Sequence, residues 1–175
     1  MRNLLSTKDQ RQLRLMETLI QNRNWMKLHE LAEKLGCTER ILKSDLNELR
    51  LAFPSIDIQS SVNGIMIDLE VNTSVEDVYQ YFLANSQSFQ LLEYMFFNEG
   101  LPIYRTIENL HSSNANLYRL GRNITKVLSS QFQIELSFTP SEIRGNEIDI
   151  RYFFAQYFSE RYYFLDWPFP DLPEE

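Results

Sequence analysis

The sequence predicts an α+β fold, mainly helical with small β-hairpin wings, arranged as two tandem winged helix–turn–helix domains. Three observations predict it: a helix–turn–helix pattern over residues 28–53, a hairpin pattern directly behind it, and a recurrence of the whole succession over residues 103–150. We expect the first domain over 1–71 and the second over 72–165, with an extra linking helix. Residues 166–175 are expected to be a linker toward a C-terminal part beyond this chain.

The first helix of the first domain is predicted over residues 7–22, where apolar side chains recur at helical spacing. Its inner face comprises Leu13, Met16, Leu19 and Ile20. A second helix follows, with one apolar stripe made of Leu28, Leu31, Ala32 and Leu35. Gly36 ends this helix, because glycine adopts the left-handed conformation behind a helix without a Cβ clash.

The third helix begins after Thr38, a typical N-cap, and ends at Pro54, which removes a backbone donor. We expect it to bury Ile41, Leu42, Leu46, Leu49 and Phe53. Its outer face is polar and comprises Glu39, Arg40, Lys43, Ser44, Asn47 and Arg50. A helix–turn–helix inserts its second helix into the major groove of DNA, so the predicted partner of this face is duplex DNA. Taken alone, the stretch fits an ordinary helical hairpin of a bundle equally well.

A hairpin pattern directly behind this helix favours the winged-helix interpretation. Two short alternating apolar runs, over residues 56–62 and 65–69, flank Asn63-Gly64. The Asn-Gly pair predicts a type I′ turn, because both residues accept a positive φ angle. An ordinary helical bundle would not need such a hairpin.

The same succession recurs in the second half of the chain, which indicates an internal repeat. A single constant shift along the chain superimposes Leu28 on Ile103, Leu35 on Leu110, Leu42 on Leu117, Leu49 on Ile124, Phe53 on Leu128, and the cap Thr38 on Ser113. The stretch QIELSFTPSEIRGNEIDI then predicts a second hairpin with its turn near Arg144-Gly145-Asn146. In this second hairpin, Ile148 and Ile150 would take the places of Ile67 and Leu69.

Further helices are predicted around and behind the join at residues 70–76. Thr73 or Ser74, followed by Glu76 and Asp77, predicts a helix start with acids near the positive end of the helix dipole. The expected helices cover 75–84, 88–98, 103–111, 113–130 and 151–164, with a break at Gly100 and Pro102.

The chain carries a net charge of −7, and the distribution of that charge bears on a nucleic-acid partner more than the total. Residues 1–53 carry ten Lys and Arg against seven Asp and Glu, whereas residues 54–100 carry no base and seven acids. Residues 109–134 contain three bases and no acid, namely Arg119, Arg122 and Lys126. Both proposed recognition helices therefore lie in locally basic stretches, as phosphate neutralisation requires.

Several classes of protein are disfavoured by the sequence. The single cysteine, Cys37, excludes a disulfide framework and a multi-cysteine zinc site; it is either a small packing residue or a reactive thiol. No long apolar run or signal-peptide pattern occurs, which predicts a cytoplasmic protein. His29 and His111 have no ligand or catalytic partner at a known spacing. We expect no enzyme activity, catalytic residue, metal or cofactor.

The C-terminal segment gives an alternative function. Ten aromatic residues lie between Tyr152 and Phe169, more than one helix face can bury. An exposed apolar patch commonly marks an interaction surface, so the alternative is a protein-interaction module that uses the winged helices and this aromatic segment. The final DWPFPDLPEE, with three prolines, resembles the start of a linker.

Together these features resemble the N-terminal half of Mga-type regulators, the M-protein trans-acting positive regulators of Gram-positive cocci. The first motif, LAEKLGCTERILKSDLNELRLAFPSIDIQSSVNGIMIDL, also fits antiterminator-like and sugar-responsive activators. The second comprises FQLLEYMFFNEG and YRLGRNITKVLSSQFQIEL. The resemblance implies a sequence-specific, duplex-DNA-binding activator of virulence or sugar-linked genes. It also implies phosphotransferase-related domains beyond this chain, through which a homodimer would form, and no membrane association.

The resemblance also implies two sets of DNA-binding residues. The first recognition helix would present Thr38, Arg40, Lys43, Ser44 and Asn47, and the second Ser113, Asn114, Asn116, Tyr118, Arg119, Arg122 and Lys126. Asn63 and Arg144 would lie at the wing tips. Lys and Arg would mainly contact phosphate, whereas Asn47 and Asn116 would read bases. Gly121 stands where the first helix has Leu46; a mid-helix glycine costs about 1 kcal/mol but permits close packing.

Overall fold

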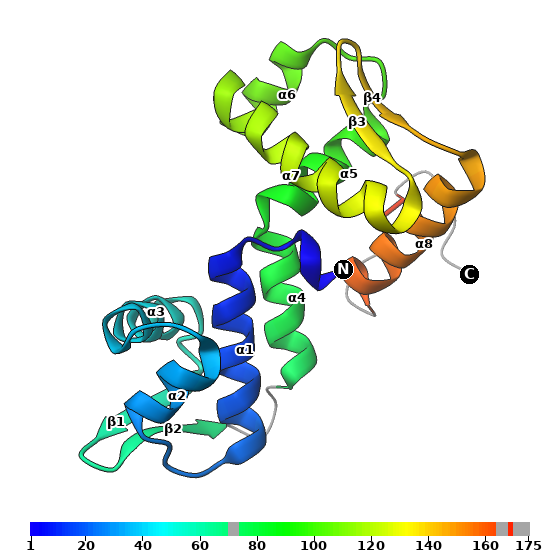
Figure 1. Ribbon diagram of the computed structural model, residues 1–175. Coiled ribbons are helices and arrows are strands. Elements are labelled where there is room, and N and C mark those ends of the chain that lie inside the picture. Colours follow the sequence, from blue (N-terminus) through cyan, green and yellow to red (C-terminus); the bar gives the residue numbers. More distant parts are fainter. Residues whose placement is uncertain (70–73, 164–167, 170–175) are drawn as a thin grey trace. The chain divides into compact units, whose positions relative to one another are not determined.

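The computed structural model describes residues 1–69, 74–163 and 168–169 (Figure 1). It contains helices and two separate antiparallel hairpins, as the sequence predicts. In chain order the elements are η1 (Arg2–Leu4), α1 (Thr7–Asn22), α2 (Leu28–Leu35), α3 (Glu39–Ala52), β1 (Ile56–Ser61), β2 (Gly64–Leu69), α4 (Val75–Asn85), α5 (Gln87–Phe97), α6 (Ile103–Asn109), α7 (Asn114–Phe132), β3 (Glu135–Phe138), β4 (Ser141–Arg144) and α8 (Glu147–Tyr162).

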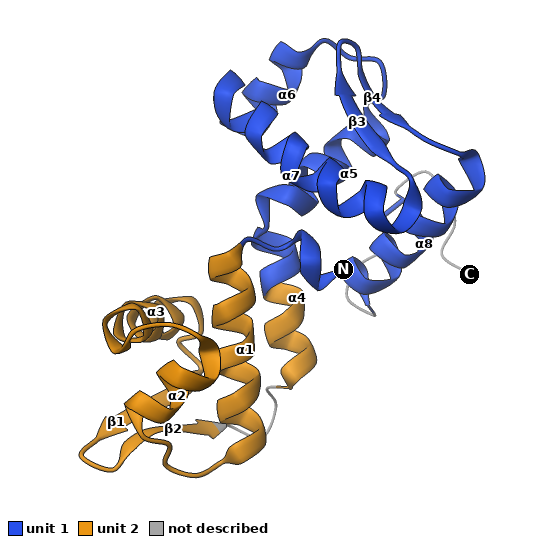
Figure 2. Cartoon of the chain, viewed as in Figure 1, with its two compact units in different colours: residues 1–6, 82–175 blue, residues 7–81 orange. Residues whose placement is uncertain are grey.

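The chain forms two compact units (Figure 2). The N-terminal unit comprises Thr7–Tyr81, and the C-terminal unit comprises Met1–Ser6 together with the chain from Phe82 onward. We expected a boundary at 71/72, whereas the compact units divide inside α4. The reason is that α4 supplies both cores: the ring of Tyr81 packs against Phe53, 4.6 Å between centroids, while Phe82 is buried in the other unit.

The core of the N-terminal unit forms between α1, α2, α3 and the first hairpin. All four residues predicted for the inner face of α1 are buried. On α3 the prediction is confirmed for Leu42, Leu46 and Leu49, but it is wrong for Ile41, which is 40% exposed. The inner face of α3 instead includes Asp45, which is only 2% exposed and which an apolar pattern cannot indicate.

The turn between α2 and α3 has the predicted caps. Gly36 adopts the left-handed conformation (φ 65°), and its N–H donates to the carbonyl oxygens at the end of α2. The Thr38 hydroxyl accepts a hydrogen bond from the Ile41 N–H at 3.3 Å, which satisfies a donor that the first turn of α3 leaves open. These caps fix where the proposed recognition helix begins.

The first hairpin is confirmed, but its turn differs from the prediction. Ser61 lies opposite Gly64, so the two turn residues are Val62 and Asn63. Gly64 is the first residue of β2 and has the positive φ, 125°. A Cβ there would overlap the carbonyl oxygen of Met26. The Met26 N–H donates to the Ile65 carbonyl at 2.9 Å, and the Ile65 N–H donates to the Met26 carbonyl at 2.8 Å. The glycine is therefore needed for a close backbone approach to the segment before α2.

The C-terminal unit repeats the arrangement with the predicted offset. Helices α2 and α6 begin at Leu28 and Ile103, and α3 and α7 begin at Glu39 and Asn114, so both pairs of starts are separated by the shift found in the sequence. The Ser113 hydroxyl accepts from the Asn116 N–H at 3.2 Å, which confirms the second cap. The superimposed apolar residues Leu117, Ile124 and Leu128 are buried.

The second hairpin lies earlier in the chain than predicted. Strands β3 and β4 turn at Thr139-Pro140, joined by a cis peptide bond, and Glu135 pairs with Arg144 at the opposite end. The expected turn at residues 144–146 is therefore wrong. Ile148 and Ile150 lie in α8, because Asn146 caps that helix by accepting from the Ile148 N–H at 2.8 Å.

Gly121 permits close packing, against a strand rather than a helix. A Cβ at this position would overlap the ring of Phe138 on β3, which is buried. The glycine in α7 therefore creates the space that the second wing fills.

The aromatic residues of α8 mostly form the core of the C-terminal unit. Phe153, Phe154, Tyr157 and Phe158 are buried, and the Tyr157 hydroxyl lies 2.8 Å from the backbone oxygen of Phe89. The N-terminal segment also joins this unit: Leu4 and Leu5 are buried, and the Met1 ammonium pairs with Glu160 at 3.3 Å. Within the described residues, no helix combines the length and the apolar character that crossing a membrane requires.

Candidate nucleic-acid interface

The outer face of α3 presents five of the predicted site residues to solvent. Thr38, Arg40, Lys43, Ser44 and Asn47 are all exposed. Positions 40, 43, 44 and 47 follow the spacing i, i+3, i+4 and i+7, so they lie on one face of the helix. This face offers two cations, a hydroxyl and an amide, which are the groups that bind phosphates and base edges.

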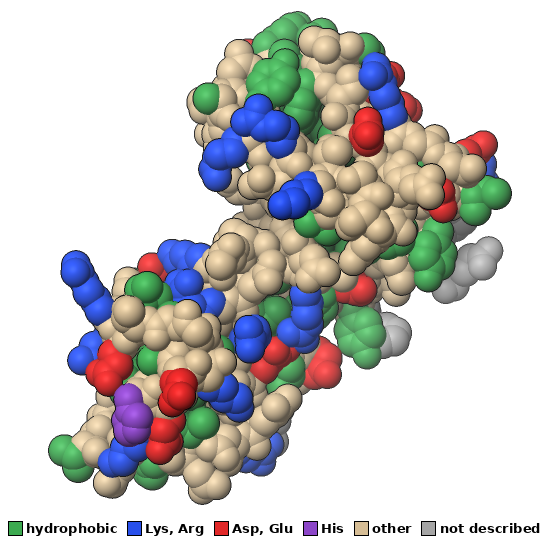
Figure 3. Space-filling model, in the orientation of Figure 1, with side chains coloured by type: hydrophobic (Ala, Val, Ile, Leu, Met, Phe, Trp, Pro, Cys, Tyr) green, Lys and Arg blue, Asp and Glu red, His purple; other side chains and the backbone are tan. Residues whose placement is uncertain are grey.

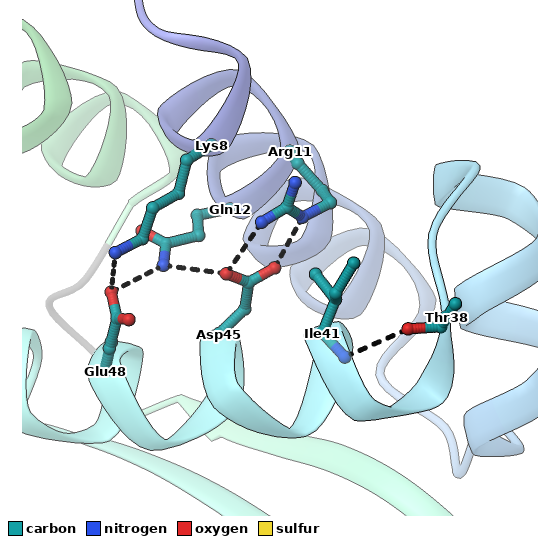
Figure 4. Close-up of polar contacts among 7 residues, drawn as sticks. All are labelled: Lys8, Arg11, Gln12, Thr38, Ile41, Asp45 and Glu48. Carbon is teal, nitrogen blue, oxygen red and sulfur yellow. Dashed lines mark hydrogen bonds and ion pairs between the residues drawn. The ribbon is translucent and has the colours of Figure 1, made fainter.

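Two acids of α3 point the other way, into a polar network with α1 (Figure 4). Arg11 binds Asp45 through both ends of its guanidinium, Nε to Oδ2 at 2.6 Å and Nη2 to Oδ1 at 3.1 Å. Gln12 donates to Asp45 at 3.1 Å and to Glu48 at 3.0 Å, and Lys8 pairs with Glu48.

The network neutralises the negative charge that α3 carries on its inner side. The hydrogen bond to Asp45 raises the pKa of Arg11 above its ordinary value. Hydrogen bonds from Lys8 and then Gln12 lower the pKa of Glu48. Asp45 and Glu48 are thus matched by α1 cations, so neither offsets the exposed charges of Arg40 and Lys43. Sequence analysis missed this network; the available signal was Asp45 at a buried position between Leu42 and Leu49.

Arg50 was predicted on the outer face of α3, but it is half-buried against the wing. Its Nε donates to the Ile58 carbonyl at 3.0 Å, and its Nη2 donates to the Ser60 hydroxyl at 2.5 Å. Its Nη1 donates to Oδ1 of Asn47 at 3.2 Å. One guanidinium therefore connects the recognition helix, the wing and a proposed base-reading side chain.

The outer face of α7 is basic and free of acids along its whole length. Ser113, Asn114, Arg119, Arg122 and Lys126 are exposed. Tyr118 is also exposed, with its ring edge-on to Phe138 at 5.2 Å. Figure 3 shows blue Lys and Arg side chains over the α6–α7 part of the C-terminal unit. The second helix can thus supply phosphate contacts as the first can.

Asn116 differs from Asn47 because both ends of its amide are bonded within the protein. Its Nδ2 donates to the Ser112 hydroxyl at 2.9 Å, and its Oδ1 accepts from Arg119 at 2.7 Å. Among the described residues, Nδ2 of Asn47 has no hydrogen-bond partner. Of the two predicted base readers, Asn47 therefore has both amide hydrogens free, whereas Asn116 already donates one of its two to Ser112.

The first wing has the expected residue, Asn63, at its tip, whereas the second wing does not have Arg144 there. Asn63 lies in the first turn and is exposed, beside Val62, whose carbonyl accepts from Lys27 Nζ at 3.1 Å. Arg144 is not at a wing tip: it ends β4 at the far side from the turn and pairs with Glu142. The second wing tip consists of Thr139-Pro140, because the hairpin closes earlier in the chain.

The single cysteine lies in the turn between α2 and α3. Burial raises the pKa of the half-buried Cys37 thiol, which favours the neutral form rather than a reactive thiolate. Across residues 1–69, 74–163 and 168–169, no group of three or more His, Cys, Asp and Glu is arranged to hold a metal ion.

Comparison with known families finds a separate model for each helix–turn–helix unit. Residues 71–158, half of the chain, match the model described as the Mga helix-turn-helix domain. The chain belongs to the Mga family. Residues 6–65 also match the M protein trans-acting positive regulator (MGA) HTH domain. Each match contains one of the two helix–turn–helix units described above, α2–α3 and α6–α7.

Two curated relatives of this Mga-family chain are named as regulators. A protein of Streptococcus pneumoniae serotype 4, named as a trans-acting regulator, is 49% identical over the whole chain, which covers 36% of that protein. The capsule synthesis positive regulator AcpA of Bacillus anthracis is 26% identical over 94% of the chain, which covers 34% of it. The chain thus spans about a third of the length of these relatives.

Proposed function

We propose that this chain is the DNA-binding part of a transcriptional regulator, and that it binds duplex DNA sequence-specifically through α3 and α7. The observation that carries the proposal is the outer face of α3, where Arg40, Lys43, Ser44 and Asn47 are exposed together. The acids Asp45 and Glu48 are bonded to α1, which leaves Glu39 as the acid of α3 beside Arg40 and Lys43, so a phosphate backbone meets a net positive charge there.

The second recognition helix supports a second DNA contact. Arg119, Arg122 and Lys126 give α7 an exposed basic face without acids. We infer that α7 contributes mainly phosphate contacts and that α3 contributes more of the sequence reading, because Asn47 is exposed with both amide hydrogens free, whereas Asn116 is half-buried and donates one of its two to Ser112.

The names of the relatives support an activating role. AcpA is named as a positive regulator of capsule synthesis, so we propose that the whole protein activates genes of a virulence-linked or sugar-linked kind. Because the chain spans a third of its relatives, we place dimerisation in domains beyond it. The cytoplasm, where the DNA lies, is the proposed site of action.

The proposal is tested by the fluorescence anisotropy of a labelled promoter duplex, titrated with protein at a series of potassium chloride concentrations. Affinity should fall steeply with salt because bound cations release counterions from the DNA. Arg40→Ala combined with Lys43→Ala should weaken binding and reduce the salt slope by about two. Arg151→Ala, which removes an exposed cation of α8, is the matched control. Affinity that does not change with salt would contradict the proposal.

The relative weight of the two helices is measured in the same assay. Arg40→Ala and Arg122→Ala each remove one exposed cation from one recognition helix. Equal losses indicate that both helices contact DNA. A loss confined to Arg40→Ala indicates that the C-terminal unit is a spacer or a dimer contact.

An interaction surface remains the second candidate function, favoured by exposed rings on α5. Phe96 and Phe97 are exposed although their rings contact rings of α8; the Phe96 and Phe154 rings are tilted, with centroids 4.5 Å apart. Tyr157 and Phe158 are buried, so alanine there would test folding rather than recognition. Phe97→Ser is the informative variant. If the exposed rings bind another protein, this change should abolish transcriptional regulation and leave the affinity for DNA unchanged.

A further inference from the structure

The position of Arg50 determines which atoms Asn47 can offer to DNA. Arginine is a donor only, so the Asn47 atom that faces Nη1 of Arg50 at 3.2 Å must be the side-chain oxygen. The amide therefore has one orientation, with Oδ1 toward Arg50 and the NH₂ group away from it. The orientation of an asparagine amide is commonly ambiguous, and here the partner removes the ambiguity.

Arg50 is itself firmly held, which makes the orientation of Asn47 durable. Its other two donors bind the backbone of Ile58 and the hydroxyl of Ser60, both on β1. The planar guanidinium thus has three partners in a fixed fork, and its two bonds to the wing hold Nη1 toward the Asn47 oxygen. Asn47 is exposed on the same face as Lys43 and Ser44, where its amide hydrogens can meet a ligand.

Base edges in the major groove differ in what they offer to such a group. Guanine presents two acceptors, N7 and O6, whereas adenine presents the N7 acceptor and the N6 amino donor. An asparagine that reads adenine must accept from N6 with its oxygen. In this protein the Asn47 oxygen already accepts from the Arg50 guanidinium. An adenine N6 amino group that approached the same oxygen would be repelled, because its hydrogens and the guanidinium are both positively polarised. An acceptor such as O6 is attracted instead.

We propose that Asn47 donates its amide hydrogens to a guanine in the major groove, and that Arg50 is the positioning residue that sets this preference over adenine. The inference rests on the proposed function, in which α3 enters the groove. It assigns guanine as the base that Asn47 contacts. It also gives Arg50 a role in orienting Asn47 that does not require Arg50 to contact DNA.

The experiment selects bound sequences from a duplex pool with a randomised central segment, using the protein and single-residue variants. The protein should show one G·C position with a preference over A·T of about ten-fold, as expected for one well-placed base contact. Asn47→Ala should remove the preference at that position alone. Arg50→Lys keeps the charge but loses the fork, so guanine and adenine should become equivalent there within about two-fold.

Two further variants separate reading from folding. Gln59→Ala removes a side chain of β1 that donates to Asp57 rather than accepting from Arg50, so base preferences should not change. Asn47→Asp keeps an oxygen for Arg50 but removes both amide hydrogens, so the guanine preference should disappear even if Arg50→Lys fails to fold.

The outcomes distinguish this inference from the proposed function. If the protein shows no salt-dependent binding to the pool, the proposed function fails and the base assignment fails with it. If binding is salt-dependent but Asn47→Ala keeps every base preference, only the inference is overturned. An Asn47-dependent position that prefers adenine would also overturn it, because the oxygen would then be accepting from the base.

Discussion

Arg50 on α3 and Thr125 on α7 occupy equivalent positions in the internal repeat, and each bonds the first strand of its wing. The Arg50 Nε donates to the Ile58 carbonyl at 3.0 Å, and the Thr125 Oγ1 accepts from the Leu136 N–H at 3.0 Å. The two units thus use the same helix position to attach the wing, with a donor in one and an acceptor in the other. The wing and the recognition helix in each unit are therefore expected to move together.

Removing the Thr125 hydroxyl should loosen the second wing. Thr125→Val keeps the shape but leaves the Leu136 N–H without its acceptor, which should lower the free energy of unfolding by about 1–2 kcal/mol. Urea unfolding followed by circular dichroism measures this. Thr18→Val on α1 is the matched control, and an equal loss there would contradict a specific role for Thr125.

Breaking the Arg11–Asp45 pair should destabilise the N-terminal unit. Asp45→Ala removes the carboxylate partner of the half-buried Arg11 and leaves Gln12 with Glu48 as its remaining acceptor. Since Arg11 retains 20% exposure, we expect a loss of about 2–3 kcal/mol, below that of a fully buried pair. The free energy of urea unfolding is the measurement. Arg151→Ala, in an exposed pair with Glu147, should cost less than about 0.5 kcal/mol.

Glu48 should contribute an acid-sensitive part of the stability. Its folded pKa is lowered from the ordinary 4.5 by the bonds from Lys8 and Gln12. A group whose folded pKa is lowered stabilises the fold above its unfolded pKa and loses that effect as the pH falls through the folded value. Unfolding free energies measured from neutral pH to below 4.5 should therefore fall less steeply for Glu48→Gln. An acid slope that is the same with and without Glu48→Gln would contradict this assignment.

Tyr157 should act at the opposite end of the pH range. Burial, and after it the nearby Glu93 carboxylate, raises the pKa of this hydroxyl. The stability it contributes is full below the unfolded pKa of 10.0 and is lost as the pH rises above that value. Tyr157→Phe should flatten the alkaline decline in the unfolding midpoint, at the cost of the bond to Phe89. An unchanged alkaline decline would contradict this assignment.

Gly121→Ala should destabilise the C-terminal unit although alanine favours helices. The new methyl would overlap the ring of Phe138, which is buried, and overpacking of this kind costs about 1–3 kcal/mol. Thermal unfolding should show recovery in the double variant Gly121→Ala with Phe138→Leu. The reverse control, Ala155→Gly on the exposed face of α8, should cost about 1 kcal/mol.

Helix starts and internal repeats were predictable because they depend on neighbouring residues. Thr38 and Ser113 cap their helices as expected, and one constant offset relates both pairs of helix starts. The Ser74 cap is confirmed too, with its hydroxyl accepting from the Asp77 N–H at 3.1 Å. Thr73 lies outside the described residues.

The predicted position of the second hairpin was wrong because the pattern of residues 147–150 fits both a strand and the start of a helix. Residues 147–150 alternate like a strand, yet two acids beside a capping asparagine equally start a helix. The true turn at Thr139-Pro140 contains proline, a turn signal that the apolar alternation outweighed in our prediction. Arg144 was assigned to a wing tip as a consequence.

The polar contacts of the site were not predictable, because they join residues distant in the chain. Arg11 and Asp45 are 34 positions apart, and no local pattern pairs them. The same holds for Arg50 and Ser60, which meet only once the wing has folded onto α3. A sequence shows which side chains can face solvent, whereas the orientation of the Asn47 amide depends on the tertiary fold.

The docking of residues 1–6 with α8 has a consequence for synthesis on the ribosome. Residues 1–6 belong to the C-terminal unit, and their partner Glu160 is synthesised near the end of this chain. All residues of the N-terminal unit, Thr7–Tyr81, are synthesised well before Glu160. At translation rates of roughly 5–20 residues per second, the N-terminal unit has several seconds to fold while Leu4 and Leu5 wait for their partners. We therefore expect nascent chains stalled before α8 to contain one folded unit and a protease-sensitive N-terminal end.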